Sequence, residues 1–226
     1  MENMDPLGKI PLFASLSPPE RQQLANRAIT RHYPAGDFIV LSDEIWPYLF
    51  WIQSGKVTAV KESYEGRSLV LTTIGAGEVF WGPAFFIESV PMPAALLAEL
   101  DCELLLWSRQ MMLPFLLKDG RLAWELAQKV MGRVLLASDI VEKLAFQSVA
   151  GRLAGFLLEQ SEDKKTGPIS RDLTLDEMAA RVGSTREMVC RFLHRFASDG
   201  LIDITRTEFS LIDRPRLEEL ANSVKG

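Results

Sequence analysis

Hydrophobic and polar positions follow helical spacing in some parts of this chain of 226 residues and strand-like alternation in others. Near the N-terminus, apolar positions between Leu12 and Ala28 predict a short pair of helices, with Ser17 capping the second one at a Pro-Pro first turn. From residue 31 to about residue 108, short apolar or alternating runs are separated by turns rich in glycine and proline. Many short strands at regular spacing are typical of an antiparallel sandwich or barrel.

Helical periodicity returns over residues 111–145, where apolar residues alternate steps of three and four positions. This spacing gives a heptad seam about three heptads long, which consists of Ala127, Val130, Val134, Ala137, Val141 and Leu144. Charged residues occupy the opposite face, and the small residues of the seam permit two helices to approach closely. We therefore expect a dimerisation helix, although a helix packed on its own domain would show the same periodicity.

The C-terminal part begins at a hinge, residues 146–148, and continues with a helix over 149–160 and strand-like pieces near Ile169 and Leu173. Residues 174–196 then have the pattern of two short helices joined by a tight turn at Gly183, a position that often requires positive φ. Two strand patterns, 201–204 and 208–212, flank a turn, and a short helix follows at 214–224. This order is typical of a winged helix-turn-helix, whose second helix enters the major groove of DNA.

The second helix of this pair carries side chains suited to DNA. Ser184 or Thr185 can cap the helix and contact a phosphate through its hydroxyl or a backbone amide. Arg186 lies on the first turn, which reaches deepest into the groove, and Arg191 follows five residues later. An ordinary helical hairpin would show the same apolar positions, so the two arginines are what favours DNA.

Composition narrows the class of protein. The proportions of hydrophobic and charged residues, 47% and 24%, are typical of a globular domain. No run of about 18 uncharged apolar residues predicts a membrane-spanning helix. The N-terminus has no signal-peptide pattern, so we expect a cytoplasmic protein without a membrane partner.

The formal net charge of −5 argues at first against nucleic acid. Residues 148–226 nevertheless carry 12 basic and 13 acidic residues, so this part of the chain is nearly neutral. Within it, positions 184–197 hold three arginines and a single glutamate. A local positive face on a near-neutral domain suits sequence-specific binding with modest nonspecific affinity.

Catalytic and metal-binding patterns are missing from the sequence. The two cysteines, Cys102 and Cys190, are too few for a four-cysteine iron–sulfur site within the chain, and they form no metal-ligand cluster. No Ser/His/Asp constellation occurs, and the GxG of residues 75–77 has no helix after it that would bind a phosphate. We therefore expect neither an enzyme nor a metal centre.

Ordered motifs over nearly the whole chain resemble the cyclic-AMP receptor protein/fumarate–nitrate regulator (CRP/FNR) family of bacterial transcription regulators. They are, in order, LFASLSPPERQQLA, RHYPAGDFIV, IQSGKV, EGRSLVLTTIGAGEVF, LAELDCELLLWSR, LAFQSVAGRLAGFLL and TLDEMAARVGSTREMVCRFLHRFASDGLI. The resemblance implies an α+β fold, in which residues 1–110 form a double-stranded β-helix (a jelly roll of the cyclic-nucleotide-binding type) that senses an effector. A dimerisation helix and hinge would occupy 111–146, and a winged helix-turn-helix domain 147–226. The resemblance also implies a homodimer on double-stranded DNA, with RNA polymerase as a partner.

The same resemblance implies which bases are read. Family members whose recognition helix has the order Arg-Glu-three residues-Arg read a TGTGA-like half-site of an inverted repeat, and Arg186, Glu187 and Arg191 have this order. Arginine can donate two hydrogen bonds to guanine, and glutamate can accept one from cytosine. We therefore expect both arginines on guanines and Glu187 on a cytosine. Phosphate contacts are expected from Thr174, Ser184 and Thr185.

One part of the family pattern is missing, and it concerns the effector. Members that bind cyclic nucleotides carry a glutamate for the ribose and an arginine for the cyclic phosphate. Here the glutamate position falls on Pro83 and the arginine position on Met92 or Pro93. No basic residue lies between Arg67 and Arg109. A buried phosphate without a cation is costly, and the threonine-serine pair of the dimerisation helix is replaced by Ala137-Ser138. The sequence therefore argues against cyclic AMP.

Apolar side chains crowd the same region, and they predict an apolar effector pocket. Its candidate residues are Trp46, Phe50, Phe80, Trp81, Phe86, Met92, Trp107 and Ser138. Some of the aromatic residues would be core of the roll, because strand side chains alternate between faces. Such a pocket suits haem, a flat aromatic molecule or an acyl group.

Haem-dependent nitric-oxide or carbon-monoxide sensors exist in the family, and His32 is the candidate haem ligand, although a histidine at the surface end of a strand would look the same. Our first expectation is an effector, of unknown identity, that is not a cyclic nucleotide. A haem-based gas sensor and a cyclic-nucleotide-responsive regulator with an atypical pocket are the alternatives.

Overall fold

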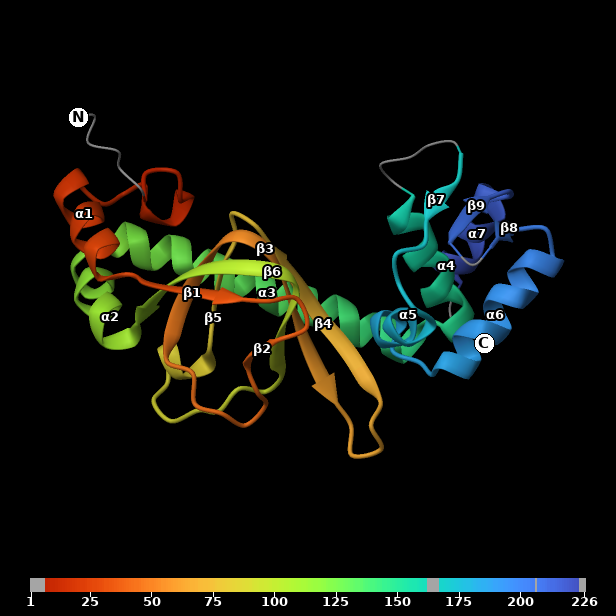
Figure 1. Cartoon of the computed structure of the whole chain (residues 1–226), viewed down its shortest axis with the longest axis horizontal. Coiled ribbons are helices and arrows are strands. Elements are labelled where there is room, and N and C mark those ends of the chain that lie inside the picture. Colours follow the sequence, from red (N-terminus) through yellow and green to blue (C-terminus); the bar gives the residue numbers. More distant parts are fainter. Residues whose placement is uncertain (1–6, 162–166, 206, 224–226) are drawn as a thin grey trace. The chain divides into compact units, whose positions relative to one another are not determined.

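A computed structural model describes residues 7–161, 167–205 and 207–223 of the chain (Figure 1). The chain divides into two compact units. The first comprises the residues up to Lys61 together with Thr72–Leu135, and the second comprises Glu62–Leu71 together with the residues from Leu136 onward. The boundary between the two units falls after Leu135, within the long helix Gly120–Phe146. The three-part division expected from the sequence stays a prediction.

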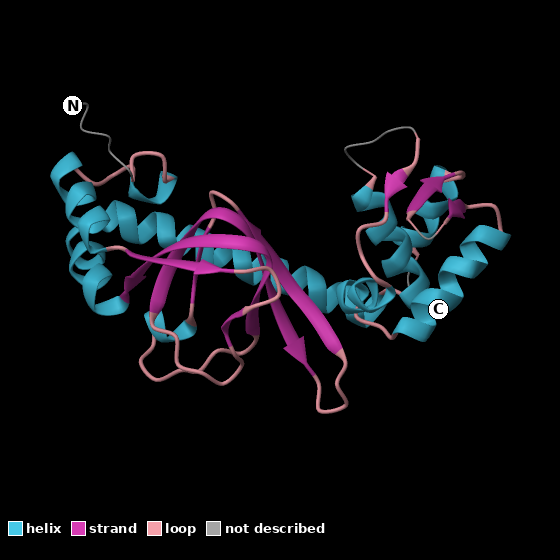
Figure 2. Ribbon diagram, in the orientation of Figure 1, coloured by secondary structure: helices cyan, strands magenta, loops and turns pink. Residues whose placement is uncertain are grey.

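The first unit is built around a sheet of order β1-β6-β3-β4 (Figure 2). The strands are β1 (Ile29–Tyr33), β2 (Phe38–Val40), β3 (Tyr48–Glu62), β4 (Ser68–Gly75), β5 (Val79–Trp81) and β6 (Ala95–Ser108). The last residue of β3 and the first four residues of β4 are assigned to the second unit. Two 3₁₀-helices lie at Pro11–Phe13 and Pro83–Phe85. β6 pairs antiparallel with β1, β2 and β3, and β5 pairs antiparallel with β3. Side chains alternate along β6, where Leu96, Ala98, Leu104 and Leu106 are buried. The antiparallel strands predicted from the alternating runs are thus confirmed.

A separate core of the first unit surrounds Trp107 at the end of β6. The helices α1 (Pro18–Arg27), α2 (Arg109–Lys118) and the first turns of α3 (Gly120–Phe146) contribute to it. The Trp107 ring meets the Phe13 ring edge-on, with centroids 5.1 Å apart, and its Nε1 donates to the Leu24 carbonyl at 3.0 Å. The backbone amide of Ser17 donates to the Glu20 carboxylate at 2.9 Å at the start of α1, where the sequence predicts a cap.

The helical region predicted over 111–145 divides into the two helices α2 and α3. The chain leaves the helical conformation at Asp119, whose Oδ1 accepts from the amides of Arg121 at 2.9 Å and Leu122 at 3.2 Å. This carboxylate starts a new helix, which the apolar periodicity did not reveal. Farther along α3 the seam is largely open, since Val134 and Val141 expose 54% and 66% of their surface.

The second unit contains the predicted helix-turn-helix and wing. β8 (Ile202–Ile204) and β9 (Glu208–Leu211) pair antiparallel, and β7 (Ile169–Ser170) adds to β9. The helices α4 (Val149–Gln160), α5 (Leu175–Val182), α6 (Arg186–Ser198) and α7 (Arg214–Asn222) surround a core that includes Leu153, Leu157, Val189, Leu193, Phe196, Phe209 and Leu217. The strand-like piece expected near Leu173 is not a strand, because this residue lies in the irregular segment between β7 and α5.

Candidate nucleic-acid interface

The turn between α5 and α6 sets the geometry of the candidate interface. Gly183 has φ 62° and ψ 50°, the left-handed conformation that glycine adopts without a steric penalty. Its amide donates to the Ala179 carbonyl and closes α5. A Cβ atom at this position would lie 2.6 Å from Leu144 Cδ2. The predicted sharp turn at Gly183 is therefore confirmed, and its left-handed conformation favours glycine there.

Threonine caps begin both helices of the motif. At the start of α5, Thr174 Oγ1 accepts from the Glu177 amide at 3.2 Å, and the Thr174 amide donates to Glu177 Oε2 at 2.7 Å. At the start of α6, Thr185 Oγ1 accepts from the Met188 amide at 3.3 Å. Of the two residues that the sequence offers as a cap for α6, Thr185 takes the position, while Ser184 is half-buried in the turn.

The three residues expected to read bases are all exposed on α6. Arg186 is the first residue of the helix, and its Nη1 lies 3.1 Å from Asp176 Oδ2 on α5. Arg191 places Nη2 against the Met188 sulfur, and its guanidinium carbon lies 5.9 Å from the centroid of the Phe192 ring.

Glu187 supplies an acceptor between these two donors. A hydrogen bond from its own backbone amide, followed by one from the Thr185 hydroxyl, lowers the pKa of its carboxyl. The group is therefore ionised at neutral pH and can only accept hydrogen bonds. The exposed face of α6 thus carries two guanidinium groups and one carboxylate.

Arg152 on α4 holds the end of α5, a contact that no sequence pattern predicts. Its guanidinium donates to three backbone carbonyls, those of Val182 at 2.7 Å, Gln147 at 2.7 Å and Gly183 at 3.1 Å. Burial lowers the pKa of this guanidinium from its ordinary value, and the group remains charged. One side chain therefore ties the hinge after α3 to the turn of the helix-turn-helix.

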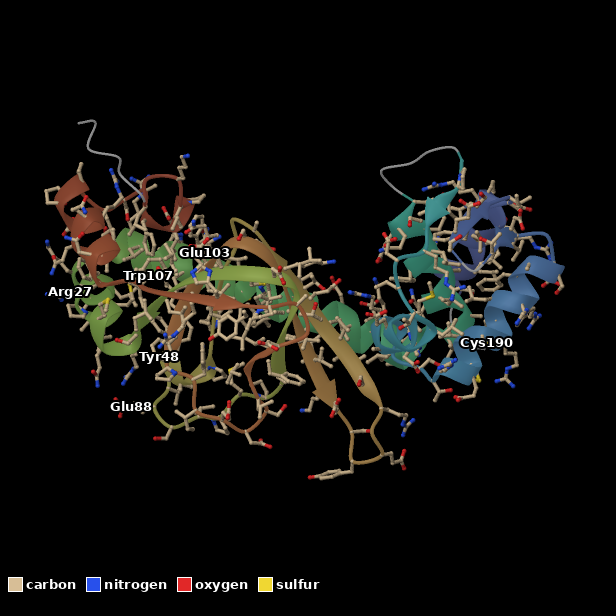
Figure 3. The ribbon with its side chains drawn as sticks, viewed as in Figure 1. Arg27, Tyr48, Glu88, Glu103, Trp107 and Cys190 are labelled. Atoms are coloured by element: carbon tan, nitrogen blue, oxygen red, sulfur yellow. The ribbon has the colours of Figure 1, made fainter. Side chains whose placement is uncertain are left out.

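The residues expected to line the effector pocket separate into two groups. Several of the aromatic rings adjoin one another: Phe80 lies 5.8 Å from Phe50 and 5.6 Å from Trp81, and Trp81 lies 5.9 Å from Phe86, between ring centroids. Met92 is also buried in the first unit. Trp107 (Figure 3) belongs instead to the core beneath the N-terminal helices, where it is fully buried and hydrogen-bonded.

Two further candidates lie outside the row of rings. Trp46 stacks at a tilt on Tyr48, with centroids 5.1 Å apart, and its Nε1 is buried with no hydrogen-bond partner among the described residues. Ser138 is an exposed residue of α3. The structure thus joins Phe50, Phe80, Trp81 and Phe86 into one row, and Trp81 of this row also packs against the core that buries Trp107.

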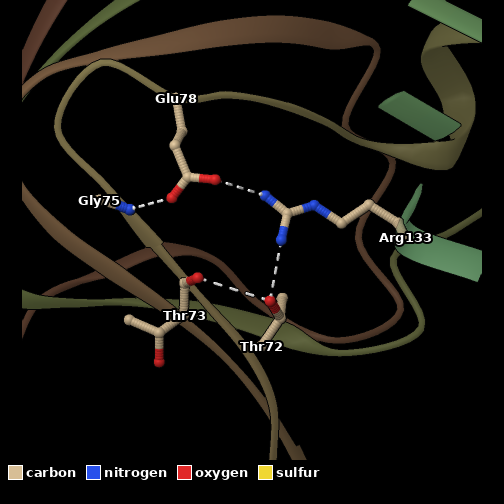
Figure 4. Close-up of polar contacts among 5 residues, drawn as sticks. All are labelled: Thr72, Thr73, Gly75, Glu78 and Arg133. Atoms are coloured by element: carbon tan, nitrogen blue, oxygen red, sulfur yellow. Dashed lines mark hydrogen bonds and ion pairs between the residues drawn. The ribbon is translucent and has the colours of Figure 1, made fainter. Parts of the chain in front are cut away.

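Arg133, a cation from the long helix, lies beside the same aromatic row. Arg133 Nη1 donates to Thr72 Oγ1 at 3.0 Å, and its Nη2 lies 3.2 Å from Glu78 Oε1 (Figure 4). The other oxygen of Glu78 accepts from the Gly75 amide at 2.7 Å. The Arg133 guanidinium carbon also lies 5.4 Å from the centroid of the Phe80 ring.

This network changes the charge argument against a cyclic phosphate. No basic residue lies between Arg67 and Arg109, but Arg133, from a distant part of the sequence, contacts Thr72, Glu78 and the Phe80 ring. The aromatic row therefore has a cation beside it. Because Glu78 already pairs with this cation, an anionic ligand would have to compete with a carboxylate for it.

His32, the candidate haem ligand, is exposed on β1 and is paired in register with Glu103. It borders a surface hollow of about 300 Å³, whose other lining residues are Tyr33, Pro34, Ser54, Asp101, Cys102 and Glu103. None of the residues expected in the effector pocket lines this hollow. Among the described residues, no group of three or more His, Cys, Asp or Glu side chains is placed to hold a metal ion.

Burial raises the pKa of the Cys102 thiol, whose Sγ lies 3.0 Å from the Leu100 carbonyl and 3.3 Å from the Lys56 carbonyl, so its one S–H can donate to either of them. This cysteine is a hydrogen-bonded thiol of the β3–β6 pairing. In the described part of the chain, no helix is long and apolar enough to cross a membrane.

Family models match two parts of the chain. A model of the cyclic nucleotide-binding domain matches residues 30–119, and a model of the Crp-like helix-turn-helix domain matches residues 151–220. The first match covers the strands of the roll, and the second covers the turn at Gly183 together with the exposed arginines. Together they confirm the predicted fold class.

Individual proteins are similar over nearly the full length. The transcriptional regulator SdrP of Thermus thermophilus is 30% identical over 200 residues, which are 86% of this chain and 95% of the relative. The cyclic AMP receptor protein of the same organism is 28% identical over 211 residues, 93% of this chain and 96% of the relative. A crystal structure of a CRP/FNR-family transcriptional regulator from Thermus thermophilus matches with a TM-score of 0.70 and 28% identity, covering 87% of this chain and 100% of that one.

Proposed function

Because the chain belongs to the CRP/FNR family of DNA-binding transcription regulators, we propose that it reads a TGTGA-like inverted repeat as a homodimer, under the control of a small effector. The observation that carries this proposal is the exposure of Arg186, Glu187 and Arg191 on one helix. A capped start and a left-handed turn fix that helix in place. The charges and hydrogen-bonding groups of these three residues match the base edges of the proposed half-site.

The spacing of the two arginines supports the proposed sequence. Arg186 and Arg191 are five residues apart, which corresponds to about 7.5 Å along a helix. The two guanines of a TGTGA half-site are separated by two base-pair steps, or about 6.8 Å. Each guanidinium can donate two hydrogen bonds to one guanine, and the ionised Glu187 can accept from the amino group of a cytosine on the other strand.

Three residues near the helix starts are proposed to hold phosphates. Ser184 and Thr185 lie at the N-terminus of α6, where backbone amides and the helix dipole favour an anion. Thr174 has the same place on α5, but its amide and hydroxyl already bond to Glu177. A phosphate contact by Thr174 would therefore replace one of these bonds. Such contacts position the protein on DNA without reading its sequence.

The exposed seam of α3 supports a homodimer. Four of the six seam residues, Ala127, Val134, Ala137 and Val141, are exposed, and the other two are half-buried. An apolar helix face of this length is the kind of surface that a second copy covers in a coiled coil. A dimer would present two recognition helices to half-sites one DNA turn apart, about 34 Å. The family also suggests RNA polymerase as a partner of the DNA-bound dimer.

The proposed effector site is the aromatic row of the first unit with Arg133 beside it. Phe50, Phe80, Trp81 and Phe86 supply apolar surface, with Trp46 and Met92 as further candidates in the same unit. Trp107 is left out because its ring is fully buried and hydrogen-bonded, and Ser138, the remaining candidate from the sequence, belongs to the second unit. The arrangement suits a ligand with a flat or apolar body and one anionic group near Arg133.

Two other effectors are alternatives for the same site. The cyclic AMP receptor protein among the relatives favours a cyclic nucleotide in an atypical pocket. Haem is the second alternative, with His32 as the candidate ligand from the sequence; this residue borders a surface hollow that none of the aromatic candidates lines, so haem held by His32 would occupy another site.

Fluorescence anisotropy on short duplexes tests the DNA proposal. The wild-type chain should bind an inverted TGTGA repeat with a higher affinity than a duplex in which both guanines of each half-site are replaced. The difference should persist in 0.2 M salt, because base contacts are less sensitive to salt than phosphate contacts. Equal affinity for the two duplexes would contradict the proposal.

Ligand titrations separate the three effector classes. Haem as cofactor predicts a sharp Soret band that saturates at one haemin per subunit, and adsorbed haemin gives a broad band that does not saturate. Cyclic AMP and a panel of aromatic and acyl carboxylic acids are compared by thermal stabilisation, with Arg133→Met as the control variant. A ligand of the proposed class should stabilise the wild type and lose most of this effect in the variant.

A further inference from the structure

We propose that Asp176 is a positioning residue that orients Arg186 and thereby helps to set sequence specificity, an inference that rests on the DNA-reading function proposed above. Asp176 lies on α5 and Arg186 on α6. Arg186 Nη1 donates to Asp176 Oδ2 at 3.1 Å, so the first base-reading side chain is joined to the neighbouring helix of the motif.

The backbone holds both partners at capped helix starts. Asp176 is the second residue of α5, within the capping box of Thr174 and Glu177. Arg186 is the first residue of α6, directly after the Thr185 cap. The left-handed turn at Gly183 joins the two helices and sets the distance between their starts. The ion pair therefore spans two fixed points of the backbone.

This contact restricts the guanidinium plane without using all of its donors. A guanidinium has five N–H groups in a planar fork, and its bidentate contact with guanine requires two of them in the plane of the base. Asp176 binds Nη1 and leaves donors on the other nitrogens. A fork that is already oriented loses less conformational freedom when it meets the base. Orientation from the carboxylate should therefore favour guanine over a base that lacks this pair of acceptors.

Charge alone would make Asp176 unfavourable at this position. The residue is exposed beside the face that we propose meets the DNA, where a carboxylate repels phosphates of any sequence. Removing its charge should therefore raise the affinity for all DNA. A group that weakens binding in general but orients one base-reading side chain increases discrimination rather than affinity.

Arg191 provides an internal comparison. It contacts the Met188 sulfur and lies near the Phe192 ring, and neither group is charged. Both arginines are exposed on the same helix, and both are proposed to read guanines. An effect of Asp176 by orientation should appear at the base pair read by Arg186 and not at the one read by Arg191.

The experiment measures the affinity of the full-length chain for a TGTGA inverted repeat and for two duplexes, each with one guanine of the half-site replaced. Arg186→Ala and Arg191→Ala first assign a guanine to each arginine. The guanine read by an arginine is the one whose replacement no longer lowers the binding affinity of the variant that lacks this arginine. We expect Asp176→Asn to lower discrimination at the Arg186 guanine roughly three- to tenfold. Discrimination at the other guanine should stay unchanged, and affinity for nonspecific DNA should rise about two- to threefold.

Two variants act as controls. Asp199→Asn removes the same charge from another exposed ion pair of α6, where Arg195 Nε lies 3.6 Å from Asp199 Oδ2. It should raise affinity for all duplexes alike. Asp176→Asn in the Arg186→Ala background should leave discrimination as it is in Arg186→Ala alone, and thermal melting shows that each variant is folded.

Two results would overturn the inference: equal changes in affinity for all three duplexes, or stronger discrimination in Asp176→Asn. The first would make Asp176 a general repulsive charge, and the second would make it a competitor of the DNA for Arg186. Failure of the proposed function itself looks different, because the wild-type chain would then discriminate at neither guanine.

Discussion

Replacing Arg152 tests whether one side chain holds the helix-turn-helix to the hinge. Arg152→Lys keeps the positive charge but offers a single nitrogen in place of three donor positions. Lysine can therefore retain about one of the three hydrogen bonds to the carbonyls of Val182, Gln147 and Gly183. The carbonyls of Val182 and Gly183 lie at the end of α5, and that of Gln147 lies directly after α3. Backbone acceptors at helix ends have no partner within the helix, so the two carbonyls that lysine does not reach would lose their hydrogen bonds.

The expected loss follows from the number of bonds and their exposure. A hydrogen bond from a charged donor contributes about 1.5–3 kcal/mol, so the loss of two would cost about 3–6 kcal/mol in a fully buried site. Arg152 is half-buried, and water can replace part of what is lost. We therefore expect Arg152→Lys to destabilise the second unit by about 2–4 kcal/mol. Arg171→Lys is the matched control, since Arg171 makes one bond of 3.2 Å to the Thr205 carbonyl, and it should cost less than about 1 kcal/mol.

The distribution of tryptophan separates the two units in the measurement. All five tryptophans, Trp46, Trp51, Trp81, Trp107 and Trp124, belong to the first unit. Urea unfolding followed by tryptophan fluorescence should therefore be the same for wild type and Arg152→Lys. Hydrogen exchange of peptides from α5 and α6 should show the predicted loss of protection. If these peptides exchange as slowly in Arg152→Lys as in the wild type, Arg152 is not the residue that holds the turn.

Three further predictions concern the DNA contacts, the dimer and pH. Arg186→Ala should weaken binding to the TGTGA repeat by about 1–3 kcal/mol per half-site and relax the preference for guanine; an equal loss on every sequence in an anisotropy assay would make Arg186 a phosphate contact. Val134→Asp places a charge in the exposed seam and should abolish dimerisation and DNA binding together, and a variant that still sediments as a dimer would contradict the seam. Hydrogen bonds from Lys118 and Ser17 lower the pKa of Glu20 from 4.5 to about 2. The carboxylate therefore stabilises the fold at pH values above its ordinary pKa, and this stabilisation is lost as the pH falls toward 2. Glu20→Gln should therefore lower the urea midpoint of the first unit at pH 7 and not at pH 2, whereas an equal difference at both pH values would contradict this reasoning.

The elements of the fold were largely predictable because local rules determine them. Alternation in strands, the heptad spacing of α3 and the need for glycine at position 183 are all visible within a few neighbouring residues. The break at Asp119 was missed because an aspartate between two apolar helical patterns does not interrupt the periodicity. The seam was predicted by its spacing, and its exposure in the structure agrees with a surface left for a partner.

The contacts that complete the two sites join residues far apart in the sequence. Arg133 reaches Thr72 and Glu78 across more than 50 positions, so a search along the strands for a cation could not find it. In the sequence Arg133 is one of several basic residues on the face opposite the apolar seam, a pattern that an ordinary solvated helix face also shows. Trp107 looked like a pocket residue by composition, but the register of β6 and the packing of α1 bury its ring completely.

Selection of bound duplexes from a random DNA library tests the central claim most directly. The wild-type chain, at the concentration where it sediments as a dimer, should enrich two TGTGA-like half-sites in inverted orientation, with centres about one helical turn apart. In the same selection, Arg186→Ala should lose the preference for one guanine of each half-site. Enrichment of single half-sites, or of sequences without a guanine preference, would contradict a dimer that reads DNA through Arg186, Glu187 and Arg191.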